Sequence, residues 1–135
     1  MKKIAFFDID GTLTSEIDGS IPVSAIEAIR AARANGNLMF INTGRCFQNV
    51  EERFRSIGFD GLVCGCGTNI YCEDREILHV SQTHDVTMEL LKAAQDADLD
   101  ILFESYKEVT FDRSRPLHDL SLIHISEPTR PLYIS

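Results

Sequence analysis

Short apolar runs alternate with amphipathic helical stretches over the first half of the chain, and this order constrains the fold more than any other feature. Apolar runs rich in β-forming residues occupy residues 3–9, 38–45 and 61–71. Two stretches with apolar residues at helical spacing lie between them, at residues 22–36 and 47–59. Strands that are joined by helices form parallel sheets with right-handed crossovers. We therefore expect an α/β fold with a Rossmann-like parallel sheet, whose first strand is buried on both faces.

The pattern changes near residue 80. A turn at residues 72–76 and a strand at residues 77–83 end the alternating part. An amphipathic helix is expected at residues 85–99, and residues 100–112 interleave polar and apolar side chains as a β-hairpin does. This order predicts an α/β core that is followed by the beginning of an α+β cap.

We expect three segments along the chain: a core at 1–80, the start of a cap at 81–119, and a tail at 120–135. The first eleven residues of the tail, LSLIHISEPTR, resemble the translation of a transposon-based sequencing adapter. The hypothesis is that the natural protein stops being represented near Asp119 and that the tail is translated library DNA. Re-sequencing of the source locus tests it, because an intact genomic reading frame through the tail contradicts it.

The charge of the chain restricts the class of partner. Its 13 basic and 21 acidic residues give a formal net charge of −8, which argues against nucleic acid and anionic membranes. Small phosphorylated ligands are held by local hydrogen-bond donors, so the negative net charge is compatible with their binding. The sequence has no run near the ~20 apolar residues of a membrane span, and we expect a cytoplasmic protein. The four cysteines lack the spacing of a structural zinc site and are interpreted as ordinary thiols. They are Cys46, Cys64, Cys66 and Cys72.

Two aspartates follow the first apolar run directly. Side chains two residues apart in an extended segment point the same way, about 6.5 Å apart. Asp8 and Asp10 are thus expected past the carboxyl end of the first strand, where ligands bind in open α/β sheets. Neighbouring carboxylates repel each other, which favours a bound cation, and Mg²⁺ prefers oxygen ligands. Gly11 lets the backbone turn closely around a ligand, and Thr12 can brace that turn and is a further candidate for binding the phosphate of the substrate. The alternative is an ordinary polar turn or an incomplete calcium-type loop.

A second polar sequence, INTGR, ends the second apolar run on the same expected edge of the sheet. The Thr43 hydroxyl and the Gly44 backbone N–H can hold a phosphoryl oxygen as its charge develops. Arg45 can add a bidentate clamp on a phosphate. The alternative is that the Thr-Gly pair only caps the next helix.

The sequences FFDIDGTLT, INTGR and GLVCGCGTNIY together resemble the haloacid dehalogenase superfamily, and most closely its Cof-type phosphatases with a C2-type cap, subclass IIB. The resemblance covers residues 3–119. It implies that Asp8 is the nucleophile that forms an aspartyl-phosphate, that Asp10 is the general acid and base, and that Thr43 binds the phosphate. It also implies Mg²⁺, bound by the Asp8 carboxylate and the Asp10 backbone carbonyl.

The sequence departs from the family pattern in two places. The lysine of the third family motif and the G-D-x-x-x-D-like metal ligands of the fourth are absent. Both follow a complete cap in the family, so we expect a truncated and inactive chain. The resemblance implies a Mg²⁺-dependent phosphatase that acts on a small phosphorylated metabolite. A phosphomutase-type phosphotransferase and a non-catalytic, receiver-like domain that accepts a phosphoryl group remain alternatives.

Overall fold

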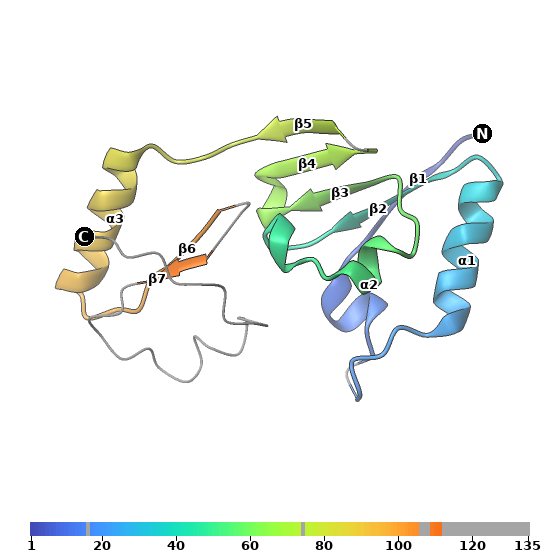
Figure 1. Ribbon diagram of the computed structural model, residues 1–135, viewed down its shortest axis with the longest axis horizontal. Coiled ribbons are helices and arrows are strands. Elements are labelled where there is room, and N and C mark those ends of the chain that lie inside the picture. The colour runs from blue at the N-terminus through green and yellow to red at the C-terminus, as the bar shows by residue number, and fades with distance from the viewer. Residues whose placement is uncertain (16, 74, 106–108, 112–135) are drawn as a thin grey trace. The chain divides into compact units, whose positions relative to one another are not determined.

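The computed structural model divides the chain into two compact units, Met1–Val80 and Ser81–Ser135. Figure 1 shows the helices and strands of each unit. The structure describes residues 1–15, 17–73, 75–105 and 109–111.

The first unit is built on a five-stranded sheet in the order β1-β2-β3-β4-β5. The first three strands run parallel, as expected, whereas β4 and β5 are antiparallel additions. The strands are β1 (Ile4–Phe7), β2 (Leu38–Asn42), β3 (Gly61–Cys64), β4 (Asn69–Cys72) and β5 (Arg75–His79).

The expectation of one strand-like run over residues 61–71 is wrong, because the run contains a chain reversal. Gly65, Cys66 and Gly67 all have positive φ, at 56°, 54° and 94°. Three successive residues in the left-handed region cannot continue a strand, and glycine adopts that region without steric cost. The reversal makes β3 and β4 an antiparallel pair, and the sheet is therefore mixed.

The first helix agrees with the sequence, but the second does not. α1 (Val23–Ala34) begins after Pro22 and lies within the predicted range. Instead of one helix over residues 47–59, a single 3₁₀ turn at Phe47–Asn49 precedes the short α2 (Glu52–Arg55). Val50 and Glu51 between them have extended backbone, with ψ of 101° and 151°. The apolar residues at helical spacing in this segment still pack in or against the core, but their burial does not require a continuous helix.

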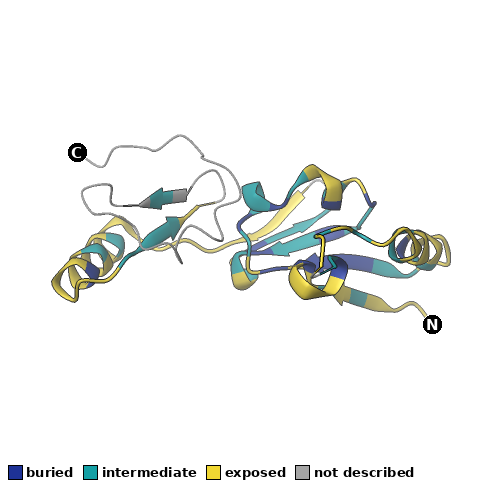
Figure 2. Cartoon of the chain, turned by 90° about the horizontal axis from the view of Figure 1, so that it is seen from below, coloured by how far each residue is buried: buried dark blue, intermediate teal, exposed yellow. Residues whose placement is uncertain are grey.

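The core of the first unit lies between the sheet, α1 and the segment that contains α2 (Figure 2). Phe54, Ile9 and Ile41 are fully buried, and they come from three different parts of the chain. The other buried members of the cluster are Leu13, Ile29, Met39, Val50, Ile57 and Cys64.

β1 is buried on one face only, which corrects the expectation of a strand buried on both. Ala5 and Phe7 pack against the core cluster, whereas Ile4 and Phe6 are 56% and 58% exposed. β1 is an edge strand, and no element in the described part of the chain covers the face that carries Ile4 and Phe6. A continuous apolar run indicates that both faces of a strand can be buried, but it does not show which elements cover those faces.

The second unit contains the expected helix and strand pair. The helix is α3 (His84–Asp96), which the Thr83 hydroxyl caps by accepting the Val86 N–H at 3.4 Å. The antiparallel strands β6 (Leu102–Glu104) and β7 (Val109–Phe111) follow. The end of the predicted cap at 112–119 and the tail at 120–135 lie outside the described residues. No helix in the described ranges is both long and apolar enough to cross a membrane.

Candidate functional site

The parallel pairing of β1 and β2 brings the two predicted motifs to one edge of the sheet. Phe7 pairs with Ile41 in register, so Asp8 and Thr43 follow the ends of neighbouring strands. The carboxyl ends of parallel strands are where open α/β sheets bind ligands. The two motifs therefore follow the ends of neighbouring parallel strands, β1 and β2, which lie side by side in Figure 1.

The Thr43–Arg45 turn is fastened to the end of β3 by backbone hydrogen bonds. The Thr43 N–H donates to the Val63 carbonyl at 2.9 Å, and the Gly65 N–H donates to the Arg45 carbonyl at 2.8 Å. A third bond joins the Cys66 N–H to the Thr43 carbonyl at 3.4 Å. The turn is thus held on a rigid part of the sheet.

The D-x-D-G sequence forms one wide turn, Ile9–Leu13, directly after β1. The Leu13 N–H donates to the Asp8 carbonyl at 3.2 Å, and Gly11 has a φ of 73°. This φ lies in the left-handed region, which explains the glycine. Ile9 and Leu13 are buried and anchor the turn, while Asp8 and Asp10 stay exposed.

The hydroxyl that braces this turn belongs to Thr14. Its Oγ1 donates to the Ile9 carbonyl at 3.0 Å, and its N–H donates to the same oxygen at 3.1 Å. Thr12, the residue expected in that role, is exposed. The Thr-x-Thr spacing after Gly11 offers both hydroxyls, and sequence alone does not show which one faces the turn.

Thr43 offers a buried hydroxyl and Gly44 an exposed backbone at the turn after β2. Thr43 is 4% exposed, and its Oγ1 accepts the Arg45 N–H at 3.2 Å, which leaves the hydroxyl proton to donate elsewhere. A Cβ placed on the exposed Gly44 would meet only the Cys66 Sγ, at 3.5 Å, so space above the turn is open. The helix-cap alternative does not describe this threonine, because the next helical turn is preceded by Cys46.

Arg45 lies against Asp10 and not in open space. Its Nε donates to Asp10 Oδ2 at 3.0 Å, and its Nη2 donates to Oδ1 at 2.6 Å. Its Nη1 contacts the Asn49 carbonyl at 3.3 Å and Glu51 Oε1 at 3.2 Å. The guanidinium carbon lies 5.7 Å from the Phe54 ring centroid. The hydrogen bonds that Arg45 donates to Asp10 are the main cause that raises the pKa of Arg45 above its usual value, and burial opposes them.

Glu51 links this arginine to a second one that the sequence interpretation missed. Arg53 contacts Glu51 Oε2 at 2.7 Å and donates to the Gly19 carbonyl at 2.8 Å. The hydrogen bond from Arg53 and then that from Arg45 lower the pKa of Glu51, although burial opposes them. Asp10, Arg45, Glu51 and Arg53 therefore form a row of ion pairs in which negative and positive side chains alternate. The E-E-R-F-R sequence was the only signal for it, and it looks like an ordinary charged helix face.

The donors at the D-x-D-G turn suit Mg²⁺ in kind. Mg²⁺ is usually held by one or two carboxylates together with water and substrate phosphate. The Asp8 carboxylate and the Asp10 backbone carbonyl are such hard oxygen donors. Within the described ranges, no group of three or more His, Cys, Asp or Glu side chains can hold a metal ion. The two oxygen donors of the turn fit a metal that takes its other ligands from water and phosphate.

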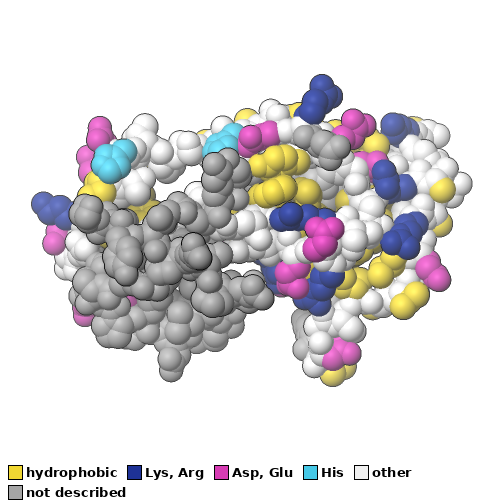
Figure 3. Space-filling model, in the orientation of Figure 1, with side chains coloured by type: hydrophobic (Ala, Val, Ile, Leu, Met, Phe, Trp, Pro, Cys, Tyr) yellow, Lys and Arg dark blue, Asp and Glu magenta, His cyan; other side chains and the backbone are white. Residues whose placement is uncertain are grey.

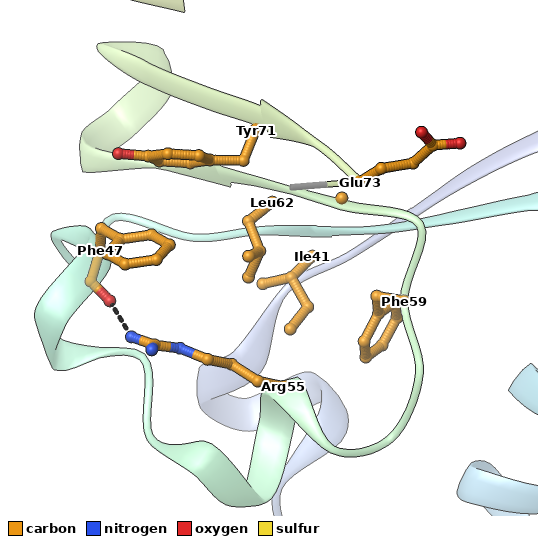
Figure 4. Close-up of a pocket in the computed structure, with 8 residues that line it drawn as sticks. Ile41, Phe47, Arg55, Phe59, Leu62, Tyr71 and Glu73 are labelled. Atoms are coloured by element: carbon orange, nitrogen blue, oxygen red, sulfur yellow. Dashed lines mark hydrogen bonds between the residues drawn. The ribbon is translucent and has the colours of Figure 1, made fainter. Parts of the chain in front are cut away.

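A hollow of about 340 Å³, lined by both apolar and charged residues, lies on the sheet near the Phe47 turn. Phe47 stacks against Tyr71 at 4.5 Å between ring centroids, and Arg55 donates to the Phe47 carbonyl at 2.5 Å (Figure 4). Figure 3 shows hydrophobic side chains of the first unit beside basic and acidic ones. The lining does not include the two aspartates or the Thr43 turn, so the hollow is separate from the candidate site.

Comparisons with known proteins find relatives of this chain in both sequence and structure. A phosphoglycolate phosphatase from Staphylothermus marinus is 30% identical over 127 residues, which cover 90% of this chain and 49% of that protein. A hypothetical protein from Geobacillus kaustophilus superimposes with a TM-score of 0.82 at 25% identity, over 98% of this chain and 52% of the other. A subclass IIB sugar phosphatase superimposes with a TM-score of 0.67 at 28% identity, over 82% of this chain and 44% of that one.

The chain thus spans about half the length of the relatives it matches. The sequence profile of the haloacid dehalogenase-like hydrolases matches residues 5–130, nearly the whole chain. That match confirms the resemblance on which the D-x-D-G and T-G-R motifs were interpreted. The chain belongs to the haloacid dehalogenase-like hydrolases.

Proposed function

We propose that the full-length protein containing this chain is a Mg²⁺-dependent phosphomonoester hydrolase that works through an aspartyl-phosphate on Asp8. The observation that carries the proposal is the meeting of two motifs at one edge of the sheet. The wide turn after β1 presents two exposed aspartates, and the turn after β2 presents a buried threonine hydroxyl and an open glycine backbone. The pairing of these parallel strands supports the proposal, because it brings the proposed nucleophile and the proposed phosphate-binding turn to one edge.

In the first step, a carboxylate oxygen of Asp8 attacks phosphorus. A bond forms between this oxygen and phosphorus, and the bond from phosphorus to the leaving-group oxygen breaks. Asp10, as a carboxylic acid, gives its proton to that oxygen, so the product leaves as an alcohol. The Thr43 hydroxyl and the Gly44 N–H donate to the non-bridging oxygens as their charge grows.

In the second step, Asp10 acts as the base. Its carboxylate takes a proton from water while the water oxygen attacks the phosphorus of the aspartyl-phosphate. The bond between phosphorus and the Asp8 oxygen breaks, which restores the Asp8 carboxylate and the Asp10 acid and releases inorganic phosphate. Bound Mg²⁺ supplies charge neutralisation between the phosphate and the carboxylates, and Asp8 and Asp10 are the residues of this chain that would hold it.

We further propose a small phosphorylated metabolite as substrate, and residues 81–119 as the start of the cap that selects it. Two relatives support the substrate class, since one is named a phosphoglycolate phosphatase and another a sugar phosphatase. The lysine and acidic metal ligands expected from the family are proposed to lie outside this chain. The tail hypothesis stays a prediction, which re-sequencing of the locus tests.

The test is hydrolysis of 4-nitrophenyl phosphate by the full-length gene product with and without Mg²⁺. We expect turnover that needs Mg²⁺ and that Asp8→Asn lowers by about 10³-fold or more, because the amide cannot attack phosphorus. Acid quenching after brief exposure to labelled substrate is expected to trap label on the wild type and not on Asp8→Asn.

Asp18→Asn is the matched control. Asp18 is an exposed aspartate in the loop that follows the D-x-D-G turn, where it accepts hydrogen bonds from the backbone and hydroxyl of Ser20. Its variant is expected to keep wild-type activity. Full turnover by Asp8→Asn would refute Asp8 as the nucleophile.

A further inference from the structure

Two parallel contacts join Arg45 to the Asp10 carboxylate across 35 sequence positions. Nε and Nη2 each hold a different carboxylate oxygen, at 3.0 and 2.6 Å. A fork that grips both oxygens fixes the plane of a carboxylate, which a single contact cannot do. The Asp10 side chain is 60% exposed, so packing restrains it little, and the fork restrains the plane of its carboxylate.

Arg45 is itself held from its far side. Its side chain is only 24% exposed, and its Nη1 contacts the carboxylate of Glu51 and the carbonyl of Asn49. The Phe54 ring lies 5.7 Å from the guanidinium carbon. A guanidinium that is bound on two edges and covered on one side is a preorganised group.

The break in the second predicted helix serves this arrangement. Val50 and Glu51 have extended backbone, and this is where the chain turns a carboxylate toward Arg45. Arg53 then holds the other oxygen of Glu51 at 2.7 Å. The local departure from helix is thus matched by a set of charge contacts that ends on Asp10.

We propose that Arg45 is a positioning residue, which orients the carboxyl group of Asp10 for its proton transfers and is itself oriented by Glu51. The inference rests on the function proposed above, because it concerns the same reaction. Each carboxylate oxygen has a second lone pair, so Asp10 can exchange a proton while Arg45 holds it. The competing role, a direct clamp on phosphate, requires the fork that Asp10 already occupies.

The experiment compares two aryl phosphates of similar shape in the full-length protein. Phenyl phosphate releases a basic phenolate, whose departure is helped by a proton from Asp10. 4-Nitrophenyl phosphate releases a stabilised phenolate that departs without one. The ratio kcat/KM reports the first phosphoryl transfer for both substrates, so the difference between them isolates the proton donor.

We expect Arg45→Gln to lower kcat/KM for phenyl phosphate by about 10- to 100-fold, within the range that general acid catalysis supplies. For 4-nitrophenyl phosphate, the expected loss is less than about threefold. The inhibition constant of inorganic phosphate should stay within about twofold of the wild type, because Arg45 does not hold phosphate. Glu51→Gln should change the same ratio in the same direction and by less, and Arg45→Lys should fall between the wild type and Arg45→Gln.

Arg33→Gln is the control for loss of an arginine–aspartate pair as such. It removes the contact with Asp60, which lies before β3 and outside the site. Its thermal unfolding midpoint reports the structural cost, and its ratio of the two kcat/KM values should equal that of the wild type.

Equal losses on both esters for Arg45→Gln would overturn the proposal and indicate a structural role. A large rise in the inhibition constant of phosphate would overturn it in favour of the phosphate clamp, and a gain in activity would show that the pair restrains Asp10 unproductively. Failure of the proposed function is distinguishable, because the wild type itself would then hydrolyse neither ester.

Discussion

Two arginine–aspartate pairs lie at opposite ends of the parallel strands in the first unit. Arg33 donates to Asp60 at 3.0 and 2.8 Å, just before β3 begins. Arg45 holds Asp10 at 3.0 and 2.6 Å, just after β1 ends. The Asp60 side chain is 15% exposed, whereas that of Asp10 is 60% exposed.

The surroundings of each carboxylate explain what it does. Asp60 Oδ2 also accepts the Met39 N–H at 2.8 Å, so this residue fastens α1 to β2. Asp10 has the same kind of arginine partner, but its carboxyl is exposed at the carboxyl ends of the strands, the end at which open α/β sheets bind ligands. The same ion pair is thus structural at the amino ends of the strands and is proposed to be functional at the carboxyl ends.

The largest expected effect on activity within this comparison comes from removing each acid in turn. Asp10→Asn is expected to lower kcat for phenyl phosphate by about 10²- to 10⁴-fold, because the amide neither gives nor takes the proton. Asp60→Asn should leave kcat per folded molecule unchanged. Steady-state kinetics on both variants of the full-length protein provide the measurement. A comparable loss of kcat in Asp60→Asn would remove the distinction between the two ends.

Thr43→Val tests the second functional group at the carboxyl ends. The change keeps the shape of the buried side chain and removes the hydroxyl, so kcat is expected to fall about 10²-fold, as when one donor to a developing charge is lost. The inhibition constant of inorganic phosphate should rise in parallel. Thr43→Ser keeps a hydroxyl and should recover most of the activity. If Ser and Val variants are equally impaired, then the hydroxyl does not bind phosphate.

Two glycines offer a steric version of the comparison. A Cβ on Gly61 would overlap the Tyr71 carbonyl and the Phe40 ring, whereas one on Gly44 would make only ordinary contact with Cys66. We expect Gly61→Ala to lower the unfolding free energy by about 3 kcal/mol, the cost of overpacking a filled site. Gly44→Ala should change stability little and impair phosphate binding. Denaturant unfolding and phosphate inhibition measure the two effects, and a stable Gly61→Ala would contradict the packing of β3 between β2 and β4.

The sequence was sufficient for those features that depend on local order along the chain. Asp8, Asp10 and Thr43 lie where strand ends and small polar residues predict them. The pairing of Arg45 with Asp10 was not predictable, because an arginine after Thr-Gly fits a phosphate equally well. Its true contact depends on a turn 35 residues away.

The fold shows the same division between local and non-local causes. α1 follows from the helical spacing of its apolar residues, from Pro22 before its first residue and from Asn35-Gly36 after its last. The break at Val50 is different, because it depends on Glu51 meeting arginines from either side in the folded state. The exposure of Phe6 also has a non-local cause. The sequence of β1 does not show whether another element of the described chain covers the face that carries Phe6.

The pH dependence of stability is expected to distinguish the amino-end pair. Burial opposes ionisation of Asp60, but Arg33 and the Met39 N–H more than offset it, and its pKa is lowered below 3.8. A lowered folded pKa contributes stability above the unfolded value and loses it as pH falls through the folded value. The difference in unfolding free energy between wild type and Asp60→Asn, about 1–3 kcal/mol at neutral pH, should therefore shrink below about pH 4. Urea unfolding from pH 7 to 3 measures it, and a difference that grows on acidification would contradict the pairing.

Two neighbouring cysteines provide the mildest test at the carboxyl ends. Cys64 is fully buried, and burial raises the pKa of its thiol to about 11, whereas Cys66 is exposed and lies beside Gly44. Since the thiolate is the reactive form, iodoacetamide at pH 8 should label Cys66 in the native protein and spare Cys64. Peptide mass spectrometry gives both rates, and labelling in denaturant supplies the control.

If phosphate binds over Gly44, then Mg²⁺ with inorganic phosphate should slow Cys66 labelling about two- to fivefold by covering the thiol. An unchanged Cys66 rate at saturating phosphate would place the phosphate away from the Thr43–Arg45 turn, and rapid labelling of Cys64 would contradict the burial of β3.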